Sequence, residues 1–353
     1  MQDKKWAVVV LNWNGRDLLE RYLPSVVKYS EEAQVYVIDN ASTDDSQSYL
    51  KRAFPAVRLI ALEENGGFAG GYNKGLEMVE EPWAVLLNSD VEVTPDWLKP
   101  LEARLESDSS LVALQPKILD WKNPQYFEYA GAAGGFLDRL AYPFCRGRIF
   151  DHLEQDRGQY DQYREVFWAS GACLAVRLEI YRELGGFYER LFAHMEEIDL
   201  CWRMQLAGYV IGCEPSSTVY HLGGATLQEA SPRKSFLNFR NSLIINVLNL
   251  PLGRLFPVLF QRLVLDGVAG FKFLLEGRPR HLQAILQAHA ALYAFFPALI
   301  RERRRREPFH SPGARLKGWL PLSIIALYFL RRKRCFDEVE STLPEASKSP
   351  ASL

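Results

Sequence analysis

The stretch "WAVVVLNWNGRDLLERYLPSVVKYSEEAQVYVID", residues 6–39, decides the fold class. It contains an apolar run at 6–11, apolar residues at helical spacing in 16–30, and a second apolar run at 35–39. A strand, a helix and a strand in this order predict two parallel strands joined by a helical crossover. The first run is too short for a signal peptide, which also favours a strand.

The same alternation continues along the next fifty residues. A helix at 42–54, capped by Ser42 or Thr43, precedes a strand at 57–62. A Gly-rich turn then opens a helix at 66–79, and another strand follows at 83–88. The predicted fold class is therefore α/β, with a mostly parallel sheet and helices on both faces.

The next part of the chain is less regular. Residues 116–165 are rich in Gly and aromatic residues, which predicts hairpins and loops. A helix is expected at about 196–207, ended by Gly208. Two short strands are expected at 209–215 and 217–224.

Charge divides the 353-residue chain into three parts. Residues 1–230 contain 22 basic residues (Lys and Arg) and 35 acidic residues (Asp and Glu), whereas residues 231–334 contain 19 basic and 4 acidic residues. The last part, residues 335–353, is polar and contains 1 basic and 4 acidic residues. We expect a globular domain at 1–230, a basic helical region at 231–334 and a disordered tail at 335–353.

The basic region is apolar, with Arg or Lys at intervals. No segment in it reaches the ~18 uninterrupted apolar residues expected of a confident membrane span. Amphipathic helices on a membrane surface, with basic residues facing anionic headgroups, fit this pattern. A soluble helical domain with solvated arginines is the alternative, and no nucleic-acid-binding motif accompanies the basic runs.

The five cysteines are widely spaced and form no CxxC pair. This spacing predicts reduced thiols rather than a disulfide framework or a zinc site. We therefore expect a cytoplasmic protein, held on the inner face of the cell membrane by its basic region.

Polar side chains follow two strands of the predicted sheet. Asp39 ends the strand at 35–39, and Asn88 and Asp90 follow the strand at 83–88. Ligands bind beyond the carboxyl ends of parallel strands, where Asp39 can accept hydrogen bonds from a nucleobase or ribose. Asn88 and Asp90 can hold Mg²⁺ or Mn²⁺ against a diphosphate, although an ordinary turn is the alternative at each position.

A Gly-rich turn, "NGGFAGGYN" at residues 65–73, lies at a third strand end. Glycines allow the backbone to approach a ligand closely, and amides at a helix start attract phosphate. The spacing matches neither GxGxxG nor GxxxxGK[ST], which argues against a dinucleotide dehydrogenase and a P-loop enzyme. A plain turn is the alternative.

Acids gather in "EEIDLCWR", residues 196–203. Glu196 and Glu197 begin the predicted helix, and a carboxylate there can take a proton from an acceptor hydroxyl. Asp199 and Arg203 stand four residues apart, which predicts an ion pair that stabilises the helix start. An exposed acidic first turn is the alternative.

Taken in order, Asp39, the Gly-rich turn, "NSD" at 88–90, "EEIDLCWR" and "HLGG" at 221–224 resemble the motifs of family 2 glycosyltransferases of the GT-A fold. The chain looks most like the rhamnosyltransferase-type members that build bacterial surface polysaccharides. The resemblance covers residues 5–225.

The resemblance implies roles for the metal site and the base. Asp90 would be the main ligand of a divalent cation, because Asn88 replaces the first acid of the family's DxD pattern. His221 would approach the metal or the diphosphate. Glu197 would be the general base, and Glu196 is the other candidate.

The resemblance also implies a substrate-binding surface. Asp39 would contact the base of a sugar nucleotide, and small residues at 170–172 would let the chain pass close to it. The candidate substrate-binding residues are Asp39, Asn40, Asn65, Gly66, Gly67, Asn73, Asn88, Ser170, Gly171 and Asp199.

The implied activity is that of an inverting glycosyltransferase. It would move a sugar from a nucleotide-diphosphate sugar, dTDP- or UDP-linked, to a glycan or lipid-linked acceptor, and it would not bind nucleic acid. A nucleotidyltransferase and a catalytically inactive sugar-nucleotide-binding protein of the same fold are the alternatives. A processive polymer synthase would need a transmembrane channel, which the short apolar segments do not supply.

Overall fold

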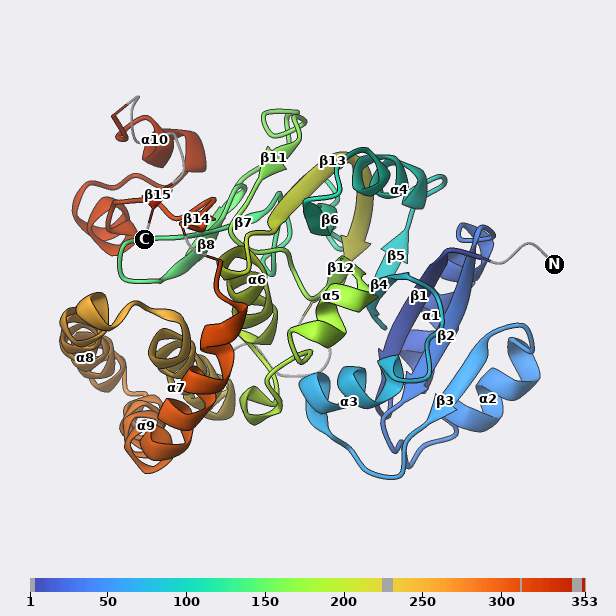
Figure 1. Cartoon of the computed structure of the whole chain (residues 1–353), viewed down its shortest axis with the longest axis horizontal. Helices are drawn as coiled ribbons and strands as arrows, with labels where there is room; N and C mark the ends of the chain where they lie inside the picture. The colour runs from blue at the N-terminus through green and yellow to red at the C-terminus, as the bar shows by residue number, and fades with distance from the viewer. Residues whose placement is uncertain (1–3, 224–230, 312, 345–350, 353) are drawn as a thin grey trace.

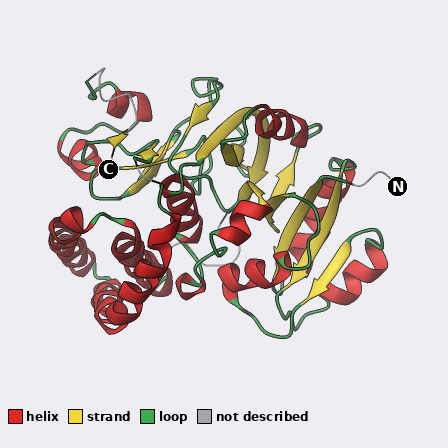
Figure 2. Cartoon of the chain, viewed as in Figure 1, coloured by secondary structure: helices red, strands yellow, loops and turns green. Residues whose placement is uncertain are grey.

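The computed structural model describes residues 4–223, 231–311, 313–344 and 351–352. A nine-stranded sheet forms the centre of the molecule (Figures 1 and 2), in the order β11-β13-β6-β12-β4-β1-β2-β3, with β5 paired to β13. Its strands are β1 (Trp6–Asn12), β2 (Ala33–Asp39), β3 (Arg58–Ala61), β4 (Trp83–Asn88), β5 (Val91–Val93), β6 (Leu111–Asp120), β11 (Arg164–Glu165), β12 (Cys173–Arg177) and β13 (Val210–His221).

The remaining elements surround this sheet. A smaller sheet holds β7 (Gly135–Leu137), β8 (Pro143–Cys145), β9 (Arg148–Ile149) and β10 (His152–Leu153), and β14 (Arg315–Leu316) pairs with β15 (Ala351–Ser352). The helices are α1 (Arg16–Lys28), α2 (Ser46–Ala53), α3 (Gly67–Leu76), α4 (Leu98–Ser107), α5 (Leu178–Glu183), α6 (Glu196–Leu206), α7 (Pro232–Asn249), α8 (Leu252–Leu275), α9 (Pro279–Arg306) and α10 (Phe336–Glu340).

The sheet is mostly parallel, as the sequence predicts. β1 runs parallel to both β2 and β4, β2 to β3, and β13 to β6. Three strands run the other way: β12 pairs antiparallel with β4 and with β6, and β5 and β11 each pair antiparallel with β13. The two strands expected at 209–215 and 217–224 form one strand, β13, with a register shift between Glu214 and Thr218.

Helices cover both faces of the sheet. Alternate residues of a strand point to opposite faces, and in β1 both sets are apolar and buried against helices. Val8 of β1 belongs to the same buried cluster as Leu23 of α1 and Leu101 of α4. Val9 belongs to the other cluster, with Tyr72 of α3. The expected helices on both faces are therefore confirmed.

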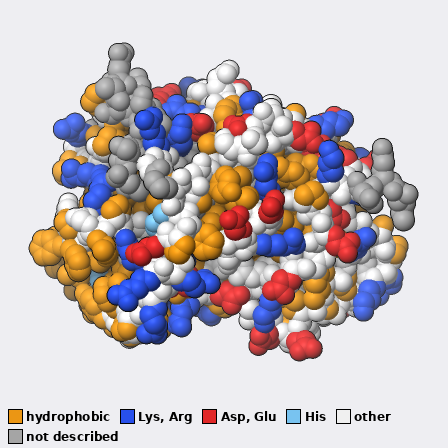
Figure 3. All heavy atoms as spheres, viewed as in Figure 1, with side chains coloured by type: hydrophobic (Ala, Val, Ile, Leu, Met, Phe, Trp, Pro, Cys, Tyr) orange, Lys and Arg blue, Asp and Glu red, His pale blue; other side chains and the backbone are white. Residues whose placement is uncertain are grey.

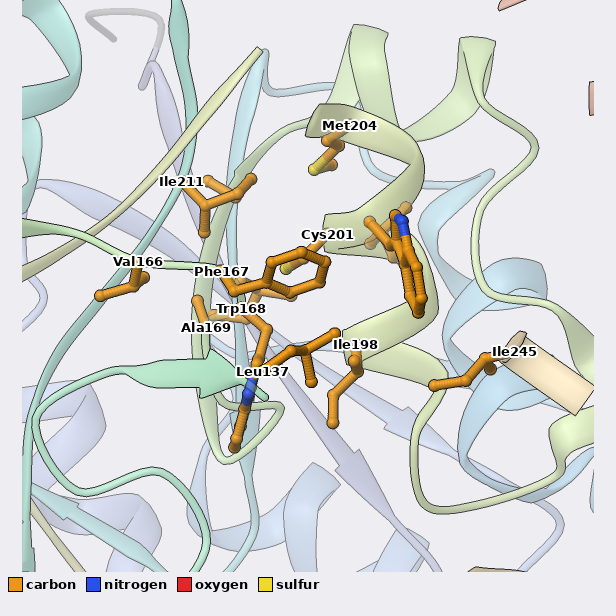
Figure 4. Packing of buried hydrophobic residues seen from close by; sticks show 14 of the residues in the cluster. Leu137, Val166, Phe167, Trp168, Ala169, Ile198, Cys201, Met204, Ile211 and Ile245 are labelled. Carbon is orange, nitrogen blue, oxygen red and sulfur yellow. The ribbon is translucent and has the colours of Figure 1, made fainter. Parts of the chain in front are cut away.

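The C-terminal helices share a buried core with the N-terminal part of the chain. Figure 4 shows Ile245 of α7 facing Ile198 of α6, and both residues belong to one buried cluster. The indole of Trp202 on α6 lies 5.4 Å from the ring of Phe167 and 5.2 Å from that of Trp319. Residues beyond 230 thus complete the packing around α6.

The helices α7, α8 and α9 lie together at one end of the molecule, at the opposite side from α2 and β3 (Figure 1). Within the described residues, one helical segment, Pro279–Phe309, has the length and composition of a membrane span. In its most apolar 18-residue stretch, 33% is buried inside the protein.

Two local predictions are wrong. The helix expected at 42–54 begins at Ser46 with Asp45 as its N-cap, because the Ser42 hydroxyl accepts hydrogen bonds from Asn12 and Asn14 instead. Residues 335–344 are not a disordered tail, since the Phe336 ring is 1% exposed and lies 4.6 Å from that of Phe136. Residues 345–350 and 353 lie outside the described residues.

Candidate active site at the carboxyl edge of the sheet

The strand register places the ends of β2, β1 and β4 side by side. In register, Asn12 of β1 pairs with Asp39 of β2, and Leu11 of β1 pairs with Asn88 of β4. Since the carboxyl edge of parallel strands is where ligands bind in such sheets, Asp39 and Asn88 lie where the sequence places them.

Asp39 is fully buried and held by three hydrogen bonds. Its carboxylate accepts from Asn12 Nδ2 at 3.1 Å, from the Ser42 amide at 3.0 Å and from Gln47 Nε2 at 2.7 Å. Trp13, directly after β1, leaves 48% of its surface exposed. Neither Asn12 nor Trp13 belongs to a motif that identifies it from sequence. Only their position, at the end of β1 and directly after it, is informative.

The Gly-rich turn is bonded to its own protein rather than open to a ligand. The Gly66 amide donates to Asn40 Oδ1 at 3.1 Å, and the Gly67 amide donates to Asn65 Oδ1 at 2.8 Å. The side-chain nitrogen of Asn40, Nδ2, in turn donates to Asn65 Oδ1 at 3.0 Å and to the Gly67 carbonyl at 2.9 Å.

The next two amides of α3 are engaged as well. The amides of Phe68 and Ala69 both donate to the carbonyl oxygen of Phe192, at 2.9 and 3.2 Å. Gly67 has φ +70°, and a Cβ there would lie 2.5 Å from the Phe192 ring. The prediction that the amides at this helix start bind phosphate is therefore wrong for this conformation: the glycine makes room for Phe192.

Asn73 lies apart from the carboxyl edge. Its Oδ1 accepts from the Tyr181 hydroxyl at 2.6 Å and from the Phe187 amide at 2.9 Å, and its Nδ2 donates to the Phe187 carbonyl at 2.9 Å. These bonds join α3 to the segment after α5, so the structure does not bring Asn73 together with the other candidates.

The end of β4 meets the end of β13. His221 Nε2 lies 3.1 Å from Asp90 Oδ1 and 3.4 Å from Asn88 Nδ2. Its other nitrogen, Nδ1, lies 3.3 Å from Glu128 Oε1. Burial lowers the pKa of His221, but Glu128 and Asp90 outweigh it and raise that pKa to about 10. Glu128 was not predicted, because it lies in the irregular segment 116–165.

Asp90 and His221 fit a divalent cation as part of its ligand set. Two neighbouring ligands of an octahedral ion, each about 2.1 Å from it, stand about 3.0 Å apart, close to the Asp90–His221 distance. In the described part of the chain, no group of three His, Cys, Asp or Glu side chains has the arrangement of a metal site. Mg²⁺ and Mn²⁺ sites of nucleotide enzymes commonly have few protein ligands, with substrate phosphates completing them.

The segment at 170–172 connects this edge to α6. The Ala172 carbonyl accepts from the Asn88 amide at 3.0 Å, and a Cβ on Gly171 would lie 3.8 Å from the Glu197 Cβ. Ser170 is 1% exposed, and its hydroxyl donates to the Ala130 carbonyl at 2.6 Å. Gly171 therefore stands beside the acids, whereas Ser170 holds the segment in place.

The two glutamates at the start of α6 are close together in a buried environment. Glu196 is 4% exposed, whereas Glu197 keeps part of its surface accessible. Among the described residues, Oε2 of each has no hydrogen-bond partner. The alternative of an exposed acidic first turn is therefore wrong.

Burial controls the protonation of both groups. It raises the pKa of Glu197 to about 7. Burial and the charge of Glu197 together raise the pKa of Glu196 well above its ordinary value. A base whose pKa lies near the working pH is well suited to proton transfer.

Asp199 is inaccessible and fully paired. One oxygen accepts from Arg203 Nε at 3.0 Å, and the other accepts from Arg306 Nη1 at 2.7 Å and from Asn249 Nδ2 at 2.8 Å. The predicted pair with Arg203 is confirmed. The structure does not place Asp199 with the candidates at the carboxyl edge, because its carboxylate is enclosed between α6, α7 and α9 by these three partners. Arg306 lies 107 residues further along the chain, and no local pattern identifies it.

Comparison with known proteins identifies the family. A sequence model described as "Glycosyl transferase family 2" matches residues 7–185. The N-acetylglucosaminyl-diphospho-decaprenol L-rhamnosyltransferase of Mycobacterium tuberculosis is 28% identical over 229 residues, which cover 61% of this chain and 75% of that protein.

Solved structures show the same fold. A mannosyltransferase from Pyrobaculum calidifontis, in complex with GDP-Man and Mn²⁺, gives a TM-score of 0.51 at 16% identity, covering 86% of this chain and 83% of that one. The structure of GalNAc-T7 with UDP, GalNAc and Mn²⁺ gives a TM-score of 0.54 at 19% identity, and the match covers 70% of this chain and 48% of that one. With half of its length matched by the family model and the acids of the site in place, the chain belongs to glycosyl transferase family 2 and is a glycosyltransferase of the GT-A fold.

Proposed function

We propose that this glycosyltransferase inverts the anomeric carbon as it moves a sugar from a nucleotide-diphosphate sugar to the hydroxyl of a lipid-linked or glycan acceptor. The observation that carries the proposal is the buried glutamate pair, in which Oε2 of each side chain has no partner among the described residues. The Cβ of Glu197 lies beside Gly171, and the next residue, Ala172, is bonded to the end of β4. A buried carboxylate oxygen without a hydrogen-bond partner is costly to maintain, and it can accept a proton from a bound substrate.

In the proposed reaction Glu197 is the general base. It takes the proton of the acceptor hydroxyl as that oxygen attacks the anomeric carbon, and the bond to the diphosphate breaks on the opposite face. Its pKa of about 7 and its accessible surface support this assignment over Glu196, which is more deeply buried. Displacement by a single attack inverts the configuration of the sugar.

The donor would lie along the carboxyl edge. Asp39, fixed by Asn12, would accept from the nucleobase or ribose, and the exposed face of Trp13 offers a surface on which a base can stack. Asp90 and His221, with Asn88 beside them, would hold Mg²⁺ or Mn²⁺. When bound, the ion neutralises charge on the leaving diphosphate.

The comparisons support the choice of substrates. The mycobacterial relative is named for a rhamnosyl donor and for an acceptor on a polyprenyl diphosphate, and the solved relatives contain UDP or GDP-Man. We propose a dTDP- or UDP-sugar as donor, and a lipid-linked acceptor.

Thermal unfolding tests donor and metal binding together. One nucleotide sugar at about 100 times its Kd should stabilise the protein by about 2.7 kcal/mol, and Mn²⁺ should increase the shift in melting temperature. Asp90→Ala should lose the Mn²⁺-dependent part. Glu92→Ala, two residues away on β5, is the matched control and should behave as the wild type.

A folded protein that shows no shift with any UDP-, dTDP- or GDP-sugar would refute the donor site. An unchanged Mn²⁺ effect in Asp90→Ala would refute the metal assignment alone.

We further propose that the protein works on the inner face of the cell membrane, with the outward face of α8 against the lipid. This face forms an apolar surface over the end of the molecule where α8 lies (Figures 1 and 3). Its exposed apolar residues are Leu252, Phe256, Phe260, Leu263, Val264, Val268, Phe271, Leu274 and Leu275.

Charge supports a lipid surface as the partner. The charged residues in the middle of α8, Arg262 and Asp266, are buried on the opposite side. At the C-terminal end of α8, Lys272 Nζ lies 6.0 Å from the ring of Phe329, which is exposed and followed by the basic run 331–334. An apolar face beside a basic cluster is suited to an anionic bilayer surface.

The helix α9 is less suited to contact lipid or to cross it. Arg306, in its last turn, is 5% exposed and bonded to Asp199 at the catalytic helix, and Arg303 donates to the Val247 carbonyl at 2.8 Å. Moving α9 into a bilayer would leave Asp199 buried without this partner, which is costly.

Vesicle sedimentation tests the docking face. Phe260→Glu should weaken binding to phosphatidylglycerol vesicles about tenfold or more, because it removes a large apolar side chain and adds a like charge. The control is Met78→Glu, since Met78 is also an exposed apolar residue but lies far from α8 in the chain. Equal binding by Phe260→Glu and the wild type, or no binding by the wild type, would contradict the assignment.

A further inference from the structure

The loop that leads into the catalytic helix has an unfavourable backbone conformation. Phe192, His194 and Met195 have φ of 64°, 70° and 73°, in the left-handed region that non-glycine residues rarely occupy. Met195 is the N-cap of α6, so the last of these angles directly sets where the helix begins. Such a conformation persists only when surrounding groups determine it.

Every carbonyl from residue 190 to residue 194 is bound by a group from α3 or α7. The amides of Phe68 and Ala69 bind the Phe192 carbonyl. Arg240 Nη2 donates to the carbonyls of residues 190 and 191, at 3.1 Å each. The remaining bonds come from one side chain, that of Asn241.

Asn241 makes the most contacts with this loop. The two hydrogens of its Nδ2 are shared among three carbonyls, those of Leu191 at 2.9 Å, Ala193 at 2.9 Å and His194 at 2.7 Å. Its Oδ1 accepts from Arg240 Nε at 2.9 Å, which fixes the orientation of the amide. The side chain is 0% exposed, so no water replaces these bonds.

We infer that Asn241 is a positioning residue for the transfer reaction. By binding the carbonyls on both sides of Phe192, it holds the left-handed turn and thereby aims Glu197 at the acceptor. The inference rests on the proposed role of Glu197. It also gives α7 a function in the active site, although this helix lies beyond the region matched by the family model.

The helix α7 offers a matched control. Asn246 is equally buried, at 0% exposure, and neither polar atom of its side chain has a hydrogen-bond partner among the described residues. Asn241→Ala and Asn246→Ala therefore remove the same atoms from the same helix. Only the first removes bonds to the loop.

Steady-state kinetics of sugar transfer tests the inference. Asn241→Ala should lower kcat about a hundredfold, because a small misplacement of a catalytic group has an effect of this size, while the donor KM stays within about twofold. Asn246→Ala should keep kcat within about twofold of the wild type. Asn241→Asp, which preserves shape but cannot donate, should resemble Asn241→Ala and serves if the alanine variant does not fold.

A double variant separates positioning from general stability. If Asn241 acts through Glu197, adding Asn241→Ala to Glu197→Gln should not reduce the residual rate further. A further hundredfold loss, or a normal kcat in both Asn241 variants, would overturn the inference. A wild-type protein without transferase activity would instead refute the proposed function.

Discussion

Sugar transfer by the Glu197→Gln variant is expected to fall by about two to four orders of magnitude, while donor binding stays unchanged. The amide keeps the shape of the carboxylate but cannot accept the acceptor's proton, and general base catalysis contributes about this much to a rate. Initial rates at saturating donor and acceptor measure the loss. The donor-induced thermal shift measures whether the binding site is intact.

The pH dependence of kcat identifies the base. Glu197 must be ionised to act, so kcat of the wild type should rise with pH and level off above about 7, the pKa of this carboxyl group. Glu196→Gln is the matched control. It should keep this rise at about pH 7, because burial rather than Glu196 is the main cause of the raised pKa of Glu197.

The reverse outcome would also be informative. If Glu196→Gln abolishes transfer and Glu197→Gln does not, Glu196 is the base and the carboxyl groups exchange roles. If neither substitution slows transfer, the proposed mechanism fails.

Asp199→Ala is expected to reduce the free energy of unfolding by about 3–5 kcal/mol. The substitution leaves Arg203 and Arg306, both nearly fully buried, without the carboxylate that lies between them. Removing one partner of a buried ion pair has an effect of this size, because the remaining charge is not hydrated. Arg306 would keep its pair with Glu302, whereas Arg203 would keep its bonds to the carbonyls of Leu184 and Gly186. Urea unfolding at pH 7 measures the difference.

The matched control is Glu20→Ala. It removes one partner of the exposed pair with Arg16, also spaced four residues apart on a helix, and should cause no measurable loss because solvent screens such pairs. An Asp199→Ala variant as stable as the wild type would show that the network with Arg306 does not hold α9 against α6.

The free energy of unfolding should fall as the pH is lowered, in part because of Asp199. Burial raises the pKa of Asp199, but Arg306 and Arg203 outweigh it and lower that pKa to about 2 in the folded protein. Its contribution to stability is therefore complete above the unfolded pKa of about 3.9 and is lost as the pH falls toward 2. Asp199→Ala should lack this part of the acid-induced loss.

Much of the catalytic half could be predicted from local pattern. The four strands that begin the sheet, and the helix from Glu196 to Leu206 followed by Gly208, agree with the sequence within a few residues. This succeeds because periodicity along a segment reflects which of its faces is buried. Because parallel strands end at one edge, the sequence also groups Asp39, Asn88 and Asp90 at a common site.

Other features depend on contacts between segments that are far apart in the sequence, and a local sequence pattern does not encode such contacts. The glycines at 66 and 67 predict a phosphate-binding turn as readily as the packing turn that Phe192 requires. The tail at 335–344 looks polar, yet Phe336 fills a gap between aromatic rings of the smaller sheet.

The sequence by itself determined the α/β class, the order of the strands along the chain and the acids at their ends, because each follows from residues that are neighbours in sequence. The tertiary structure alone decided that β12 runs antiparallel, that Glu128 meets His221, that Arg306 pairs with Asp199 and that Asn241 holds the loop before α6. These partners lie about 50 to more than 100 residues apart, or in irregular segments. Their pairing follows from the burial of charge and of backbone carbonyls in a shared core, which exists only once the chain has folded.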